Sequence, residues 1–242
     1  MKCLIIAAGQ GSRLRSLAPS KPLADVAGRP LIEHVIRRAR AGGASRFVVV
    51  TGYEAEGIET FLSAFAEREG LTITAVRNKE WHRPNGLSVA AAAPLLGDDA
   101  FLLLMSDHLF DPAILAGLIA ADDDAELTLA VDYAIDNPLI DLDDATKVDA
   151  AEDGRIRRLG KTITGWNAID AGLFRAGPSL IEAIDRSVAA GGQGSLSEGV
   201  QLLADAGRAR VHPIGGLWWA DVDDPRAHAL AEEHLRAAPQ LW

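Results

Sequence analysis

The sequence predicts an α/β protein with a mostly parallel central sheet flanked by helices. Two observations predict this fold class. Short, almost uninterrupted apolar runs recur along the chain up to Val131, and between them apolar residues follow the i, i+3, i+4 spacing of amphipathic helices. Unbroken apolar strands are typical of a parallel sheet that is covered on both faces. Right-handed crossovers between such strands favour a doubly wound arrangement.

The elements follow from these patterns in chain order. Strands are predicted at Lys2–Ala7, Arg46–Thr51, Leu71–Val76, Phe101–Met105 and Glu126–Val131, with helices around 31–39, 58–65, 87–96 and 114–119. After Val131 come an acidic, turn-rich segment at Asp132–Asp144, strand-like pieces at 146–150 and 155–160, and a strand at 167–174. Helices near 178–188 and 195–206, a strand at 209–214 and a last helix at about 224–237 complete the chain. We expect the block 141–163 to form a lid or a small sub-sheet.

The composition narrows the class of function. Of the 242 residues, 24 are Lys or Arg and 34 are Asp or Glu, so the net charge is −10. This charge argues against binding to nucleic acid or anionic membranes, because both attract a positive surface. The lone cysteine, Cys3, excludes an internal disulfide and a thiolate zinc cluster, and its apolar neighbours predict a core position.

The absence of targeting signals favours a cytoplasmic location. The first apolar run is too short for a signal peptide, and no stretch approaches the roughly 20 apolar residues of a membrane span. The oligomeric state is left open by the sequence.

The loop after the first predicted strand combines glycines with cations. It runs through Ala8, Gly9, Gly11, Ser12 and Arg13, and glycines there let backbone N–H groups approach a phosphate. Neither the dinucleotide-binding pattern nor the Walker A pattern is matched. Nearby Arg15 and Lys21 bring the loop to three cations in an acidic protein, which predicts a triphosphate cradle. The alternative is a solvated loop that only turns the chain.

The same loop carries a family resemblance. Gly9-Gln10-Gly11-Ser12-Arg13-Leu14 followed by Ser20-Lys21-Pro22-Leu23 resembles the signature of the sugar-phosphate nucleotidyltransferases, and the similarity continues along nearly the whole chain. It implies a Rossmann-like, glycosyltransferase-A-like nucleotidyltransferase fold. It also implies transfer of a nucleoside monophosphate from an NTP to a phosphorylated acceptor. We therefore expect one domain over residues 1–242, with a nucleotide-binding half at 1–131 and an acceptor-binding half at 132–242.

Three carboxylates predict a Mg²⁺ site. Asp107 follows a predicted central strand, and open α/β sheets bind ligands at the carboxyl ends of their strands. Asp221 and Asp223 are two residues apart, so in an extended segment both side chains share one face. Mg²⁺ prefers such oxygen ligands, and the resemblance supports a metal role for the segment around Asp221. The alternatives are a helix cap at Asp107 and an ordinary acidic turn near Asp221. His108 is predicted either to support Asp107 or to act directly.

Polar residues after the third predicted strand are candidates for base recognition. Asn78, Asn85, Gly86 and Ser88 carry amide and hydroxyl groups that can read a base edge, and Gly86 permits close approach. The alternative is simple turn chemistry at Asn-Gly. The stretch is similar to the cytidylyltransferase branch, which implies CTP, although the residues alone do not distinguish cytosine from other bases.

The second half carries candidate acceptor-binding residues. Lys147 and Lys161 are predicted to bind the acceptor phosphate, and Asp170 and Glu198 to accept hydrogen bonds from polyol hydroxyls; each could instead be a surface charge. Together they resemble the inositol-1-phosphate cytidylyltransferase branch, in which some relatives are fused to a membrane-embedded synthase. No membrane segment is present in this sequence, which leaves the downstream partner open; a separate membrane enzyme that uses the CDP-alcohol product is one candidate.

The predicted reaction is Mg²⁺-dependent transfer of CMP from CTP to 1L-myo-inositol-1-phosphate, giving CDP-inositol and pyrophosphate. Arg13, Lys21 and Asp107 are the predicted catalytic residues, and no general base is needed because the acceptor phosphate is already an anion. Phosphocholine or 2-aminoethylphosphonate with CTP, and a sugar-1-phosphate with another NTP, are alternative substrates. A non-catalytic nucleotide-binding regulatory module is the alternative of another class.

Overall fold

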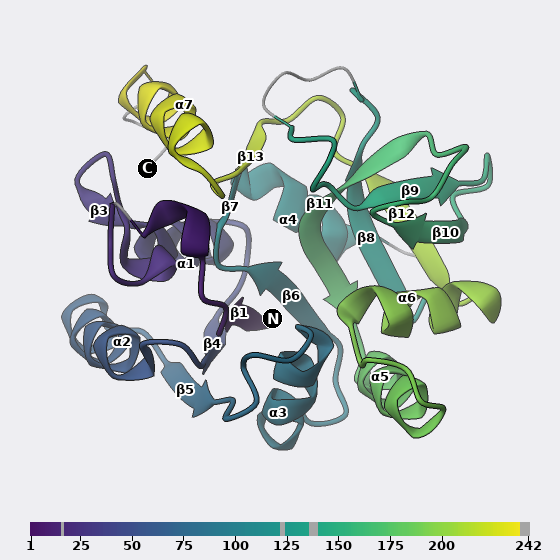
Figure 1. Cartoon of the computed structure of the whole chain (residues 1–242), viewed down its shortest axis with the longest axis horizontal. Coiled ribbons are helices and arrows are strands. Elements are labelled where there is room, and N and C mark those ends of the chain that lie inside the picture. Colours follow the sequence, from purple (N-terminus) through teal and green to yellow (C-terminus); the bar gives the residue numbers. More distant parts are fainter. Residues whose placement is uncertain (16, 122–123, 136–139, 238–242) are drawn as a thin grey trace.

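The computed structural model describes residues 1–15, 17–121, 124–135 and 140–237, and it shows a twisted sheet with helices on both faces (Figure 1). The main-sheet strands are β1 (Lys2–Ala7), β4 (Arg46–Thr51), β5 (Ile73–Arg77), β6 (Phe101–Met105), β8 (Leu127–Asp132), β9 (Lys147–Ala150), β10 (Ile156–Gly160), β11 (Ala168–Ala176) and β12 (Ala209–Pro213). The helices are α1 (Leu31–Ala41), α2 (Ala55–Glu69), α3 (Gly86–Leu96), α4 (Pro112–Ala120), α5 (Pro178–Ala189), α6 (Leu196–Asp205) and α7 (Pro225–Ala237). The predicted fold class is confirmed.

Sheet topology separates the two halves of the chain. The order is β10-β9-β11-β6-β1-β4-β5, and β8 lies against β11 and β12. Strands β6, β1, β4 and β5 are parallel, whereas β11 runs antiparallel to β6, β8 and β9. The strand expected at Glu126–Val131 therefore enters the sheet between an antiparallel neighbour, β11, and a parallel one, β12. Strands β9 and β10, within the block 141–163, form an antiparallel edge of the main sheet, and residues 136–139 of the acidic segment lie outside the described part.

The side chains of β1 point alternately to the two faces of the sheet, and each face is covered by a hydrophobic core of its own. Cys3 and Ile5 point to one side, where residues of α1, α2, α4 and α7 pack, while Leu4 and Ile6 point to the other, against α3, α5 and α6. This period of two is what a strand buried on both faces requires. Burial raises the pKa of the Cys3 thiol well above its usual range, in keeping with its predicted core position.

Two pairs of very short strands lie outside the main sheet and were missed by the apolar pattern. β2 (Asp25–Val26) pairs with β3 (Arg29–Pro30), and β7 (His108–Phe110) pairs with β13 (Trp219–Asp221). Two or three residues are too few to show any periodicity. In the described part of the chain, none of the helices combines the length and the hydrophobicity that a membrane crossing requires.

The buried side chain of His34, in α1, connects this helix to the β2–β3 hairpin. Its Nε2 donates to the Val26 carbonyl at 2.7 Å, and its Nδ1 accepts from Arg38 Nη1 at 3.2 Å. This pairing suits a neutral ring, and burial, together with the neighbouring Arg38, lowers the pKa of His34 to about 4. The native state thus holds His34 neutral where an unfolded chain would protonate it.

Stability is therefore expected to fall in acid. Between pH 6.5 and 4 the unfolded chain binds the His34 proton and the native state does not, so His34 contributes stability above pH 6.5 that is lost as the pH falls towards 4. Urea unfolding should show about 2 kcal/mol of this loss between pH 7.5 and 5. His34→Gln should remove that share of the slope, and His82→Gln, at an exposed histidine, should retain it. An unchanged slope in His34→Gln would contradict the assignment.

Candidate active site

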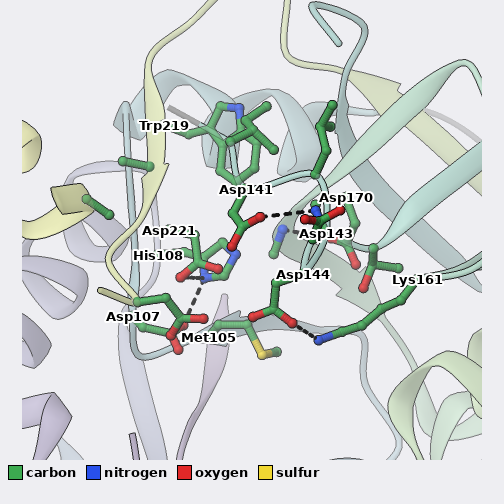
Figure 2. A pocket seen from close by; sticks show the side chains of 18 of the residues that line it. Met105, Asp107, His108, Asp141, Asp143, Asp144, Lys161, Asp170, Trp219 and Asp221 are labelled. Atoms are coloured by element: carbon green, nitrogen blue, oxygen red, sulfur yellow. Dashed lines mark hydrogen bonds and ion pairs between the residues drawn. The ribbon is translucent and has the colours of Figure 1, made fainter. Parts of the chain in front are cut away.

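A pocket of about 690 Å³ lies where the two halves of the chain meet (Figure 2). Its lining includes Met105 at the end of β6, the segment from Ile140 to Thr146, and residues of β11, β13 and the start of α7. The carboxyl end of a central parallel strand is where open α/β sheets bind ligands. The topology thus places the predicted metal ligands in one pocket with Lys161 and Asp170, two of the predicted acceptor residues.

The β7–β13 ribbon joins the predicted metal ligands. Asp221 is the cross-strand partner of His108, and the Val222 amide donates to the Asp107 carbonyl at 2.9 Å. Candidate ligand atoms of Asp107, His108 and Asp221 all lie within 4.8 Å of one another. The carboxylate of Asp223 instead forms ion pairs with loop cations. The structure thus groups two of the three predicted carboxylates with His108 and holds the third on the adjoining loop.

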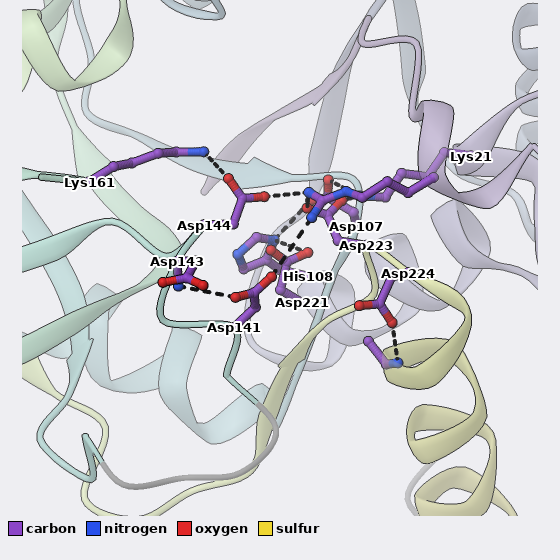
Figure 3. A network of polar contacts seen from close by, with 12 residues as sticks. Lys21, Asp107, His108, Asp141, Asp143, Asp144, Lys161, Asp221, Asp223 and Asp224 are labelled. Atoms are coloured by element: carbon purple, nitrogen blue, oxygen red, sulfur yellow. Dashed lines mark hydrogen bonds and ion pairs between the residues drawn. The ribbon is translucent and has the colours of Figure 1, made fainter.

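Lys21 faces these carboxylates (Figure 3), and Arg13 lies near them through its ion pair with Asp223. Lys21 is only 6% exposed, and its Nζ lies 2.6 Å from Asp107 Oδ2 and forms an ion pair with Asp223. Arg13 forms ion pairs with Asp144 and Asp223. Two of the three predicted phosphate-binding cations thus pair with predicted metal-binding carboxylates, whereas Arg15 lies against Tyr53.

Gly11 makes room for the lysine. It has φ +56°, and a Cβ on it would lie 2.9 Å from Lys21 Cδ, closer than real Cβ contacts allow. The glycine is therefore needed to seat the aliphatic stem of Lys21 beneath the loop. This requirement is separate from the predicted approach of backbone N–H groups at Ala8, Gly9 and Ser12 to a phosphate, and the described pocket lining includes Arg13 from this loop.

The cluster shifts several pKa values. Burial alone would raise the pKa of Asp107, but Lys21 and His108 outweigh it and hold the pKa well below its usual range. Burial would lower the pKa of His108, but Asp221, Asp107 and Asp170 raise it to about 9. Burial raises the pKa of Asp170 to about 6 and also raises that of Asp221. At neutral pH the site thus holds ionised Asp107 between two cations.

The donor set fits a hard divalent cation. Asp221 Oδ1 is buried and accepts no hydrogen bond from any residue the structure describes, and its ion pair with His108 Nδ1 is long at 3.9 Å, so it can accept a ligand. Among the residues that the structure describes, Asp107 Oδ2 is bonded only by the ammonium of Lys21, at 2.6 Å. Mg²⁺ takes one or two carboxylates together with phosphate oxygens and water, so Asp107 and Asp221 suffice for the protein's share.

The predicted base-binding residues are largely occupied within the protein. Asn78 Nδ2 donates to Ser88 Oγ at 3.1 Å, and both residues are buried. Asn85 Oδ1 accepts from the Leu196 amide at 3.1 Å, and Asn85 lines the pocket. A Cβ on Gly86 would lie 2.8 Å from the Ser195 carbonyl carbon, so the glycine permits α3 to approach α6. Of these four residues, only Asn85 reaches the pocket.

Of the four predicted acceptor residues, two line the pocket and two are bonded within the protein. Lys161 and Asp170 line the pocket. Lys147 is buried, and its ammonium donates to the Leu142 carbonyl and, at 2.7 Å, to the Lys161 carbonyl, so it holds the pocket segment in place instead of facing a ligand. Glu198 accepts from the backbone amides of Gly194 and Ser195 and from the Ser187 hydroxyl. With Ser195 it forms a capping box at α6, and it is not among the residues that line the pocket.

Asp144 is a site residue that sequence reasoning left open. Its carboxylate forms ion pairs with Arg13 and Lys161, and therefore bridges the two halves across the pocket. The Asp141–Asp144 group could be read as a solvated turn, since no spacing rule links Asp144 to a loop so far away in sequence. The only feature of the sequence that pointed to these contacts is that Asp144 carries a charge opposite to those of Arg13 and Lys161.

Glu198→Ala is expected to cost stability and not acceptor affinity. Loss of the capping box should lower the free energy of unfolding by about 1–2 kcal/mol. Glu198→Gln should lose less, because glutamine also completes a capping box. Urea unfolding and the acceptor KM of both variants check this. A tenfold rise in acceptor KM at unchanged stability would restore the predicted acceptor role.

The fold and site together define a class of protein. A glycine-rich loop with cations faces strand-end carboxylates across one pocket, as a nucleotidyltransferase requires for an NTP and its metal. The sequence model of the MobA-like NTP transferase domain matches residues 3–161, and the chain belongs to this family. The predicted enzyme class, a nucleotidyltransferase, is thereby confirmed.

Relatives match over nearly the whole chain. A "Bifunctional IPC transferase and DIPP synthase" of Rubrobacter xylanophilus is 34% identical over 235 residues, which cover 95% of this chain and 50% of that protein. A "CMP-5'-(3-aminopropyl)phosphonate synthase" of Streptomyces rubellomurinus is 34% identical over 248 residues, covering 93% of this chain and 37% of that protein. The chain thus spans about half the length, or less, of these curated relatives.

A solved structure agrees with this assignment. The inositol-1-phosphate CTP transferase from T. maritima superposes with a TM-score of 0.85 at 26% identity, covering 97% of this chain and 96% of that one. A UDP-glucose pyrophosphorylase complexed with UDP-glucose, at 16% identity and a TM-score of 0.80, shares the fold. The predicted resemblance to the inositol-1-phosphate cytidylyltransferase branch is confirmed.

Proposed function

We propose that the chain transfers CMP from CTP to 1L-myo-inositol-1-phosphate and releases pyrophosphate, with Mg²⁺ as the metal. The observation that carries the proposal is that Arg13, Asp107 and Asp221 line one pocket, with the buried Lys21 paired to Asp107. Similarity to inositol-1-phosphate CTP transferases over nearly the whole chain supports the choice of substrates.

The residues of the loop would exchange partners when the nucleotide binds. Lys21 and Arg13 now contact carboxylates, and triphosphate oxygens offer the same cations stronger, more numerous negative charges. Release of Lys21 leaves Asp107 and Asp221, with Asp223 beside them, to hold the metal. The bound metal would neutralise charge that develops on the phosphates. Loop cations that follow the pyrophosphate stabilise the leaving group electrostatically.

The acceptor side would come from residues 132–242, and the nucleotide side from 1–131. Lys161 lines the pocket and forms an ion pair with Asp144. Once this ion pair opens, the Lys161 ammonium can bind the acceptor phosphate. Asp170 can accept hydrogen bonds from ring hydroxyls. The acceptor's phosphate oxygen is already a nucleophilic anion, so the protein's task is in-line alignment and exclusion of water.

A matrix of nucleotides against acceptors tests the proposal. Pyrophosphate release should be measured with CTP, UTP, ATP and GTP against inositol-1-phosphate, phosphocholine, 2-aminoethylphosphonate and glucose-1-phosphate, with and without Mg²⁺. We expect CTP with inositol-1-phosphate to exceed every other pair, and EDTA to abolish the signal. Preference for another pair would overturn the substrate assignment. Tight CTP binding without turnover on any acceptor would favour a non-catalytic role.

An aminoalkylphosphonate is a second candidate acceptor. Asp141, Asp144 and Asp170 make the acceptor side of the pocket acidic, and an acidic wall suits an ammonium group as well as hydroxyls. The Streptomyces relative carries the name of an aminopropylphosphonate enzyme. A 3-aminopropylphosphonate well in the same matrix distinguishes the two, because only an amine-specific pocket would prefer it to inositol-1-phosphate.

A further inference from the structure

We propose that His108 is a positioning residue that fixes the Asp107 carboxylate for the metal, and that Trp219 and Gly172 lock the His108 ring in place. The inference rests on the proposed function, because it concerns the carboxylate assigned there to the metal. It chooses between the two roles predicted for His108, and it gives a role to Trp219 and Gly172, to which the sequence patterns assigned none.

The two oxygens of Asp107 have different partners. His108 Nδ1 donates to Oδ1 at 2.8 Å, whereas Lys21 Nζ lies 2.6 Å from Oδ2. Lys21 has a second carboxylate, Asp223, and would move to a phosphate, which frees Oδ2. His108 holds Oδ1 throughout, so the orientation of the freed oxygen is set by the histidine. Hydrogen bonds from such outer partners commonly orient metal ligands and strengthen metal binding.

One face of the His108 ring is held by a tryptophan (Figure 2). The rings of His108 and Trp219 stack with centroids 5.8 Å apart and planes 16° apart. Trp219 is itself fixed, since its Nε1 donates to Asp132 Oδ2 at 2.9 Å and both residues are buried. The other Asp132 oxygen accepts from the Ala134 amide. A buried, fully bonded tryptophan leaves the imidazole little freedom to tilt.

A glycine packs directly against the His108 ring. Gly172 has φ +76°, and a Cβ there would lie 2.7 Å from His108 Nε2 and 2.8 Å from its Cγ. The β11–β8 register shifts between Asp170 and Phe174, which is the irregularity that brings Gly172 against the ring. Bulges next to active sites commonly re-aim side chains in this way. Any larger residue at 172 must push the imidazole away from Asp107.

The decisive measurement is Mn²⁺ binding to the purified chain, followed by electron paramagnetic resonance without substrate. His108→Ala should weaken binding about 10–100-fold. His108→Asn should stay within about threefold of the wild type, because its amide nitrogen can donate from nearly the position of Nδ1. That variant separates positioning from direct ligation by the ring, which an asparagine amide nitrogen would not replace.

Gly172 is tested through a double-mutant cycle. Gly172→Ala should also weaken Mn²⁺ binding about 10-fold or more, and adding it to His108→Ala should have almost no further effect, because the ring it displaces is gone. Gly207→Ala is the matched control, since Gly207 has φ +70° with no atom within 4 Å of an added Cβ. It should lower the Tm comparably and leave Mn²⁺ binding at the wild-type value.

The outcomes separate this inference from the proposed function. Wild-type protein that transfers CMP and binds Mn²⁺, with His108→Ala binding equally well, would overturn the positioning role alone. Equal losses from Gly172→Ala in both backgrounds, or a loss in Gly207→Ala, would overturn the lock. A wild type that neither transfers CMP nor binds Mn²⁺ would overturn the proposed function and this inference with it.

Discussion

Asp107→Asn is expected to lower kcat by about 10³-fold while the chain stays folded. The substitution keeps the shape of the side chain and removes the charge that Lys21 and His108 hold ionised. Lys21 retains its ion pair with Asp223, so no buried cation is left alone. Pyrophosphate release at saturating CTP and acceptor measures the loss, and circular dichroism checks the fold.

Asp99→Asn is the matched control for this prediction. Asp99 is exposed and precedes β6, whereas Asp107 follows it, so the same chemical change is made at opposite ends of one strand. Its kcat should equal that of the wild type. Normal turnover of Asp107→Asn at saturating Mg²⁺ would contradict the assignment of this carboxylate to the metal.

Lys21→Ala is expected to reduce kcat/KM for CTP by about 10²–10³-fold, because a buried cation that would follow the pyrophosphate is lost. It should also change the response to metal. Without the ammonium, the Asp107 and Asp223 carboxylates repel each other, so the metal-free variant should unfold at a lower temperature than the wild type. Added Mg²⁺ should raise its Tm by more than it raises the wild-type Tm.

Lys79→Ala provides the comparison, since Lys79 is an exposed lysine beyond the end of β5. It should leave kcat/KM and the Mg²⁺ response unchanged. A Lys21→Ala variant that altered only the discrimination between acceptors would contradict the assignment of the loop to the triphosphate.

The centre of the main sheet could be predicted from the sequence because strands β1, β4 and β6 are buried on both faces. β1, β4 and β6 are runs of Val, Ile, Leu and Phe that admit few other interpretations. The β7–β13 ribbon could not be predicted, because its pairing depends on residues that are remote in sequence and too few to show a period. β8 was predicted as a strand, but its antiparallel neighbour is set by where β11 inserts, which is a tertiary outcome.

Some residues of the candidate site could likewise be predicted from the sequence, and others could not. Asp107 and the glycine loop follow from their places after apolar strands, because strand ends converge at one edge of the sheet. Lys147 and Glu198 have the right chemistry for ligands, but their charges are satisfied by nearby backbone groups. Asp144 reaches Arg13 only through the folded chain. The residue type thus predicts which groups a side chain can bind, whereas the fold decides whether groups of the same protein already bind that side chain.

The pairing of β7 with β13 bears on how the enzyme is made. A ribosome delivers the glycine loop and Asp107 early, whereas Asp221 and Asp223 emerge only near the end of synthesis. A chain stopped at residue 161, where the family match ends, would carry the nucleotide loop without the second acidic strand. Such an intermediate would lack Asp221, one of the two carboxylates proposed to hold the metal. Because the proposed metal site draws one carboxylate from each side of this ribbon, we expect a chain that has not yet closed the ribbon to be inactive.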